Sequence, residues 1–175
     1  LTFLHMTHTE VLPPMLPEVL QIDKVYLYEF GTECAYSTKP RAAEALRARM
    51  NEGTLLVNFT GHGSDQQLAD ERVFETSGVP GLTNADRLFL FFTASCSVGK
   101  YDYFGQGLGE SMLLHRGGGA ITVFSASAVA YSGGNSEMNQ KYLQALFPDR
   151  SAREPRPVGE SAVRAKLTLS QPGNI

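Results

Sequence analysis

Four short runs of apolar residues, rich in β-branched and aromatic side chains, are spread along the chain. None of them alternates apolar with polar residues, which is typical of strands that are covered on both faces of a sheet. The runs therefore predict four buried strands, at residues 24–28, 54–59, 88–94 and 120–125.

Segments with helical spacing lie between and after these runs. Residues 40–50 have a proline in the first turn, an apolar stripe that includes Leu46 and Met50, and Gly53 just past the end. Three further helices are predicted, at residues 110–115, 137–147 and 159–169. The first 20 residues receive no element, because prolines interrupt their apolar spacing.

The alternation of strands and helices predicts the α/β class, with a mostly parallel sheet and helices on both of its faces. In such sheets, ligands bind beyond the carboxyl ends of the strands. His62 follows the predicted strand at 54–59, and Cys96 follows the one at 88–94. We therefore expect both side chains at the same edge of the sheet.

Length and composition narrow the class of protein. The 175 residues are enough for one domain with a single core. The chain has 15 basic and 18 acidic residues, so its charge is nearly balanced. Neither a nucleic-acid partner nor binding to an anionic membrane surface is therefore predicted. Neither a long apolar run nor a leader is present, so any membrane association is expected only through parts outside this sequence.

The two cysteines stand in different contexts. Cys34 lies in a polar stretch, whereas Cys96 ends an apolar run. Two cysteines are too few for a disulfide scaffold, although a bridge between them stays open. Taken singly, Cys96 could be a small buried side chain, and His62, between two glycines, could be a turn residue, a metal ligand or a base.

Their shared location favours a catalytic pair. A thiolate attacks a carbonyl, and an adjacent imidazole takes the thiol proton and then protonates the leaving amine. Gly63 carries no side chain, so its N–H, together with the N–H of Cys96, could point at the developing oxyanion.

Three blocks of sequence carry a resemblance to a known family. Asn58-Phe59-Thr60-Gly61-His62-Gly63-Ser64 is followed, 34 positions after the histidine, by Thr93-Ala94-Ser95-Cys96, with Leu82-Thr83-Asn84 between them. Together they resemble the gingipain family of cysteine peptidases, relatives of the caspases, and the match runs from about residue 20 to about residue 169. Residues 69–73, 99–102 and 109–114 are similar to the type IX secretion sortase, or C-terminal signal peptidase, of the PorU type.

The resemblance implies a caspase-like three-layer α/β sandwich that lacks its N-terminal strand or strands. Residues 1–175 would be one catalytic domain, the C-terminal part of a larger peptidase domain in a longer protein. His62 would act as base and acid, and Cys96 as nucleophile. The acid that orients the histidine would precede Leu1, with Asp70, Glu71 and Asp102 as internal candidates. The loop after the last strand would help to select substrate, through Ser125, Ser127 and Tyr131.

The implied function is a cysteine endopeptidase or transpeptidase that acts on polypeptides through a thioester acyl-enzyme. Its substrates would be secreted proteins with a C-terminal sorting domain, at the outer-membrane cell surface of a Gram-negative bacterium. The chemistry needs no cofactor and no metal, although calcium supports the fold of some relatives. Two alternatives are a catalytically inactive caspase-like binding module and a general secreted gingipain-like protease.

Two other patterns are weaker. His5 and His8 could join His62 in a metallohydrolase, but no third ligand is fixed by spacing. Gly105-Gln106-Gly107-Leu108-Gly109 is spelled like a nucleotide loop. It lies too far from its strand, and lacks the acidic residue about 20 positions later that a dinucleotide-binding motif requires.

Overall fold

The computed structural model of the protein describes residues 2–6, 15–31, 38–102, 104–149, 151 and 155–170. Its central feature is a five-stranded sheet with the order β2-β1-β3-β6-β7, in which every neighbouring pair is parallel. The strands are β1 (Thr2–Met6), β2 (Gln21–Lys24), β3 (Leu56–Thr60), β6 (Phe89–Ala94) and β7 (Ala120–Ser125).

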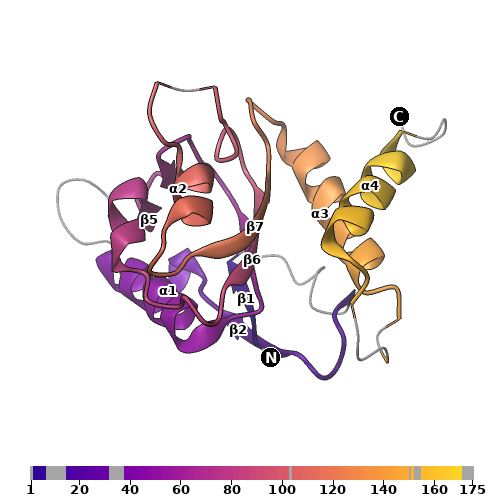
Figure 1. Ribbon diagram of the computed structural model, residues 1–175, viewed down its shortest axis with the longest axis horizontal. Coiled ribbons are helices and arrows are strands. Elements are labelled where there is room, and N and C mark those ends of the chain that lie inside the picture. Colours follow the sequence, from indigo (N-terminus) through magenta and orange to yellow (C-terminus); the bar gives the residue numbers. More distant parts are fainter. Residues whose placement is uncertain are drawn as a thin grey trace.

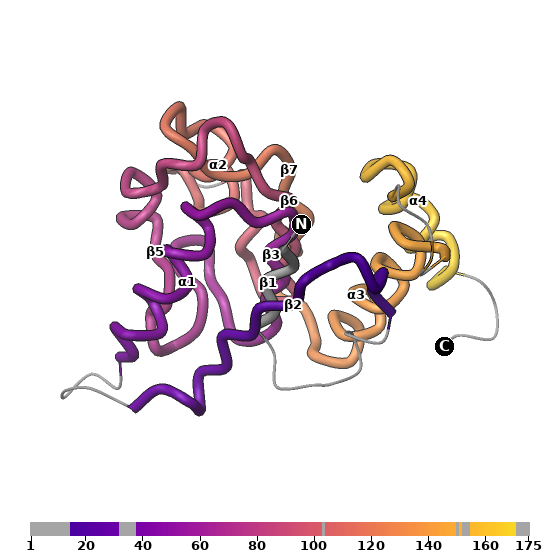
Figure 2. The backbone as a smooth tube through the Cα atoms, turned by 90° about the horizontal axis from the view of Figure 1, so that it is seen from below, coloured from indigo at the N-terminus to yellow at the C-terminus, as the bar shows by residue number. Residues whose placement is uncertain are grey.

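Helices cover both faces of this sheet (Figure 1). The helices α1 (Pro40–Gly53) and α2 (Leu108–Leu114) lie on one side, and α3 (Ser132–Leu146) and α4 (Val158–Leu169) lie on the other. Figure 2, turned by 90°, shows the same separation of the two helix pairs. The α/β class and the mostly parallel sheet that the sequence predicts are therefore confirmed. No helix in the described ranges is long and apolar enough to span a bilayer.

The two central strands explain the two-sided core. In β3 and β6, successive side chains point to opposite faces, as the pleat of a strand requires. Val57, Phe59, Phe89 and Phe91 pack with α1 and α2, whereas Leu56, Leu90 and Phe92 pack with α3 and α4. Because both faces are buried, both strands consist mostly of apolar residues without alternation.

The remaining elements are short and lie mainly between β3 and β6. A two-stranded antiparallel sheet pairs β4 (Gln67–Leu68) with β5 (Phe74–Glu75), and a 3-10 helix, η3 (Thr76–Gly81), follows it. A second 3-10 helix, η2 (Leu27–Glu29), follows β2.

The predicted strands at 54–59, 88–94 and 120–125 are confirmed within two residues. The strand predicted at 24–28 is wrong for most of its length, since β2 ends at Lys24 and the 3-10 helix η2 begins at Leu27. All four predicted helices exist. The one predicted at 137–147 begins earlier, at Ser132, where the Tyr131 carbonyl accepts a hydrogen bond from the Asn135 N–H at 2.9 Å.

The hydrophobic pattern predicted no element for the stretch that forms β1. In the structure β1 lies inside the sheet, between β2 and β3, with Met6 paired with Phe59. The strand beside the histidine-bearing strand is therefore part of this chain. Residues 7–14, which follow it, lie outside the described residues.

Candidate active site

Strand register brings His62 and Cys96 to the same edge. β3 pairs with β6 in parallel, and the last matched residues are Thr60 and Ala94. The Gly61 N–H extends this pairing by donating to the Ala94 carbonyl at 3.4 Å. His62 and Cys96 each lie two residues beyond the matched pair, so they leave the sheet side by side.

The two loops touch at Gly63. A Cβ at this position would lie 2.8 Å from Ser95 Oγ and 3.0 Å from both Ser95 Cβ and Val98 Cγ2. Ser95 and Val98 are themselves buried, so they have little room to move away. The glycine after the histidine is therefore required by the close approach of the cysteine loop.

A tight turn holds the histidine loop. The Ala69 N–H donates to the His62 carbonyl at 2.8 Å, and the Ser64 N–H donates to the Gln67 carbonyl at 2.9 Å. These two bonds make an antiparallel bridge between Gly63 and Leu68. The backbone of His62 is thus fixed while its side chain remains exposed.

Two N–H groups at this edge remain available. The bridge at Gly63 uses the carbonyl of His62 and the N–H of Ser64, and so leaves the Gly63 N–H unused. Within the described part of the chain, neither that N–H nor the one of Cys96 donates to a protein acceptor. The two groups that the sequence predicts for an oxyanion site therefore lie on adjacent loops without a competing partner.

The cysteine loop is held by the segment after β7. The Cys96 thiol is half-buried, and its Sγ lies 3.4 Å from the Ala130 nitrogen and 3.3 Å from the Ala130 oxygen. Ser97 has a left-handed backbone (φ 58°), and its N–H donates to the Ala128 carbonyl at 3.1 Å. The thiol can donate to the Ala130 carbonyl and accept from the Ala130 N–H, so this segment fixes the position of the sulfur. Cys34 lies outside the described residues.

Sequence reasoning missed the role of Gly107 and Gly109. The Leu108 N–H donates to the Asp65 carbonyl at 2.6 Å, and the Gly109 N–H donates to the Val98 carbonyl at 3.1 Å. A Cβ at Gly109 would lie 2.8 Å from that carbonyl oxygen. The absence of side chains at these glycines therefore lets the start of α2 pack closely against both the histidine loop and the cysteine loop.

Asn84 also has a structural role that its sequence block did not reveal. Its amide nitrogen donates to the Gly119 carbonyl at 2.9 Å, and its amide oxygen accepts from the Gly119 N–H at 2.8 Å. This pair of hydrogen bonds fixes the chain just before β7. In the sequence, Asn84 stood out only as part of the block Leu82-Thr83-Asn84 that resembles the family.

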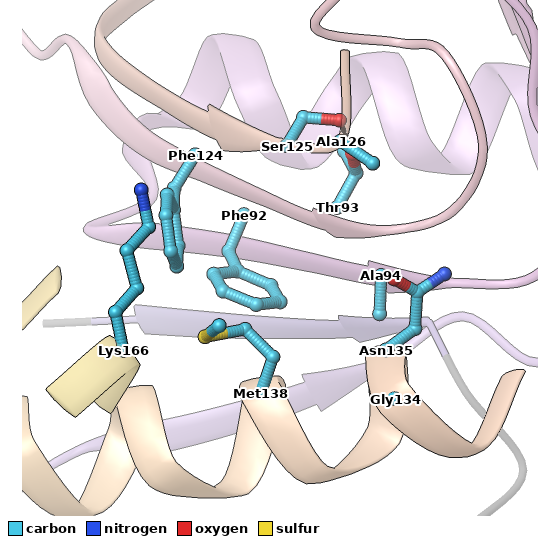
Figure 3. A pocket seen from close by; sticks show the side chains of 10 residues that line it. All are labelled: Phe92, Thr93, Ala94, Phe124, Ser125, Ala126, Gly134, Asn135, Met138 and Lys166. Carbon is cyan, nitrogen blue, oxygen red and sulfur yellow. Dashed lines mark hydrogen bonds between the residues drawn. The ribbon is translucent and has the colours of Figure 1, made fainter. Parts of the chain in front are cut away.

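A cavity of about 250 Å³ lies beside the cysteine strand, on the α3 side of the sheet (Figure 3). Ser125, one of three residues predicted to select substrate, lines it. Ser127 and Tyr131 do not line it and are exposed, Tyr131 to 85%. The lining residues are Phe92, Thr93, Ala94, Phe124, Ser125, Ala126, Gly134, Asn135, Met138 and Lys166.

Three carboxylates are the internal candidates for an acid that orients the histidine. Asp70 and Asp102 are exposed, and Glu71 is half-buried. No hydrogen bond or ion pair joins any of these three carboxylates to His62 in the ranges that the structure describes.

No metal centre is formed by the described residues, because they contain no group of three or more histidine, cysteine or acidic side chains that could hold an ion. The side chain of His5 and all of His8 lie outside the described residues. A structural calcium ion, which can also bind through backbone carbonyl oxygens, stays a prediction.

Known structures have the same fold. The chain superimposes on the complex of Porphyromonas gingivalis RgpB pro- and mature domains with a TM-score of 0.76 and 16% identity, covering 99% of this chain and 43% of that one. It also matches the Arg-specific cysteine proteinase gingipain R, with a TM-score of 0.72 and 19% identity over 96% of this chain and 41% of that one.

Sequence comparison gives the family. A Lys-gingipain of Porphyromonas gingivalis is 29% identical over 108 residues, or 62% of this chain, and a second Lys-gingipain of that species is 30% identical over 108 residues. The chain spans about 6% of the length of these relatives. The model of peptidase family C25 matches residues 4–174. The chain therefore belongs to peptidase family C25, the gingipain family of cysteine peptidases.

Proposed function

We propose that the chain is the catalytic core of a cysteine endopeptidase or transpeptidase, with Cys96 as nucleophile and His62 as base and acid. The observation that carries this proposal is the parallel register of β3 and β6, which delivers both side chains to adjacent loops in contact through Gly63. A Cys/His pair at one sheet edge is the arrangement that thiol-based acyl transfer requires.

The reaction begins when the Cys96 thiol gives its proton to the His62 imidazole. The sulfur attacks the carbonyl carbon of a peptide bond and forms a tetrahedral intermediate. When that intermediate collapses, the carbon–nitrogen bond breaks, and the leaving amine takes the proton from His62. A thioester on Cys96 remains. Water or a second amine then attacks the thioester and gives a proton to His62. The carbon–sulfur bond breaks, and the departing sulfur takes that proton from His62, which restores the thiol and the neutral imidazole.

The free N–H groups of Gly63 and Cys96 would stabilise the oxyanion of the tetrahedral intermediates. Both are backbone donors on loops fixed by packing, so they need little reorganisation as charge develops. The contacts of Ala130 with the sulfur would hold Sγ in position before attack.

We assign the finer role by resemblance. The blocks at 69–73 and 99–102 are similar to the type IX C-terminal signal peptidase, or sortase, of the PorU type. The whole protein would then act at the outer-membrane surface of a Gram-negative bacterium, on secreted polypeptides with a C-terminal sorting domain. The gingipain relatives come from the bacterium Porphyromonas gingivalis, which supports a bacterial source for this chain.

An electrophilic peptide ketone tests the chemistry directly. We expect it to label Cys96 in the protein and in the Cys34→Ser variant, and to label the His62→Ala variant at least about a hundredfold more slowly, since a general base contributes about 10²–10⁴ in rate. Mass spectrometry of tryptic peptides identifies the labelled thiol. Labelling of Cys34 alone, or of no cysteine, would favour the inactive binding module.

A further inference from the structure

The cavity beside β6 lies close to the proposed reaction site, because some of its lining residues are near neighbours of the cysteine loop. Ala94, which lines it, lies two residues before Cys96, a distance of about 6.6 Å along an extended strand. Ala126, also in the lining, accepts a hydrogen bond from the Gly99 N–H at 3.0 Å. A peptide whose carbonyl lies at Cys96 could therefore place a neighbouring side chain in this cavity.

The side chains that face the cavity are mostly apolar. Phe92 and Phe124 form one wall from the sheet, with ring centroids 5.1 Å apart, and Met138 forms the opposite wall from α3. Thr93 and Ser125 hydrogen-bond to each other, and Figure 3 shows their side chains on the side of the strands away from Met138. Aromatic and thioether surfaces of this kind favour apolar or aromatic ligands.

The charged residue in the lining is a cation. Figure 3 shows Ala94 and Asn135 at one end of the cavity and Lys166 at the other. The Lys166 ammonium lies 5.6 Å from the centroid of the Phe124 ring, so its charge is held near the cavity. No carboxylate lines the cavity among the described residues. A bound arginine or lysine side chain would thus bring a second cation toward the first, with no counter-ion among the described lining residues.

We infer that this cavity binds the substrate residue that precedes the cleaved bond, and that it selects a large apolar or aromatic side chain over a basic one. The inference rests on the proposed function, because it needs the acyl-enzyme at Cys96. It separates this chain from the relatives described as Lys-gingipain and as an Arg-specific proteinase.

Four peptidyl ketones that differ only in the residue before the reactive carbon measure this preference on the full-length protein. With phenylalanine or leucine there, we expect Cys96 to be labelled at least about tenfold faster than with arginine or lysine, because the aromatic lining favours an apolar side chain and a second cation near Lys166 is disfavoured. Equal rates, or faster labelling by a basic probe, overturn the inference. If none of the probes labels Cys96, the proposed function itself fails.

Two neighbouring glycines provide a matched pair of variants. A Cβ at Gly133 or at Gly134 would meet no atom within 4 Å, so a side chain fits at either position, yet of the two only Gly134 lines the cavity. We expect Gly134→Leu to slow the phenylalanine probe at least about tenfold, while an alanine probe changes less than about threefold, because a lost hydrophobic fit is worth about 10–200-fold. Gly133→Leu should leave both rates unchanged. The same slowing in both variants would contradict the assignment.

Reversal of the charge on Lys166 tests the electrostatic part. Lys166→Glu should raise the rate of the arginine probe relative to the phenylalanine probe about tenfold, since it replaces a like charge with a counter-ion. Arg164→Glu makes the same change of charge two residues away, about 200° around α4, and should leave the ratio unchanged. An unchanged ratio in Lys166→Glu would show that Lys166 does not face the bound side chain.

Discussion

On one face of the sheet, α1 and α2 seal the apolar side chains of β3 and β6, with Val57, Phe89 and Phe91 all 0% exposed. On the other face, α3 and α4 leave a cavity of about 250 Å³, and the buried amides of Asn58 and Asn139 join α3 to β3. The sealed face holds the loops that carry His62 and Cys96, through Val98, Leu108 and Leu68 in its core. The tightly packed core that supports the loops and the cavity proposed to bind substrate therefore lie on opposite sides of the same strands.

Two adjacent phenylalanines of β6 test this difference most strongly. Phe91→Ala should destabilise the protein by about 3–5 kcal/mol, because it opens a hole in the sealed core. Phe92→Ala should cost less, at or below about 3 kcal/mol, because Phe92 already borders a cavity. Urea unfolding of both variants gives the comparison. A larger loss for Phe92 would mean that the α3 face is the tighter one.

The contact between the catalytic loops comes next. Gly63→Ala should cost near 3 kcal/mol, about the upper end of what overpacking does, because its Cβ would be forced against Ser95 and Val98. Labelling of Cys96 should fall about a hundredfold as the two loops separate. Gly133→Ala, where the Cβ meets open space, is the control and should change neither quantity. Normal labelling of Gly63→Ala would show that the loops tolerate a wider spacing.

A buried amide pair joins α3 to the sheet on the cavity side. Asn58 donates to Asn139 at 2.7 Å and accepts from it at 3.0 Å, and both side chains are almost completely buried. Asn139→Ala should cost about 2 kcal/mol, because it leaves the amide of Asn58 buried without its partner. The double variant Asn58→Leu with Asn139→Leu should recover part of that loss, as measured by urea unfolding. A double variant that is less stable than Asn139→Ala would contradict this account.

The smallest effect is expected at Tyr142. Its hydroxyl is buried without a hydrogen-bond partner in the described ranges, and burial raises the pKa of this phenol above its ordinary value. Tyr142→Phe should therefore change stability by less than about 1 kcal/mol, or increase it.

The pH dependence sharpens this prediction. The raised pKa means that Tyr142 stays neutral in the folded protein while it ionises in the unfolded chain above about pH 10. Stability should thus decline as pH rises past that value, and Tyr142→Phe should decline less. Equal alkaline losses in both proteins, measured by thermal unfolding, would show that the hydroxyl is not held neutral.

Much of the fold could be read from local patterns. The strands β3, β6 and β7 were predictable because burial on both faces makes them continuous apolar runs. β1 was missed since it is short, contains His5, and exists only through its pairing with β2 and β3. β2 was misplaced because Val25 and Tyr26 are buried outside a strand. Burial of a strand produces an apolar run in the sequence, whereas pairing between strands produces no local pattern.

The candidate site divides in the same way. His62 and Cys96 stood out because residue type and position after a strand are both local features. Three other features could not be predicted, because each joins residues from separate loops. They are the packing of α2 at Gly107 and Gly109, the hydrogen bonds between Asn84 and Gly119, and the contact of Ala130 with the thiol.

The sequence alone determined the class of fold, the two candidate catalytic side chains and the edge at which they emerge, because these follow from residue type, hydrophobic runs and strand order. Only the tertiary structure decided which strands are neighbours, how closely Gly63 approaches Ser95, and that a cation and two phenylalanine rings border one cavity. Those features depend on distances between segments far apart in the chain, and such distances are set by packing, which leaves no periodic signal in the order of residues.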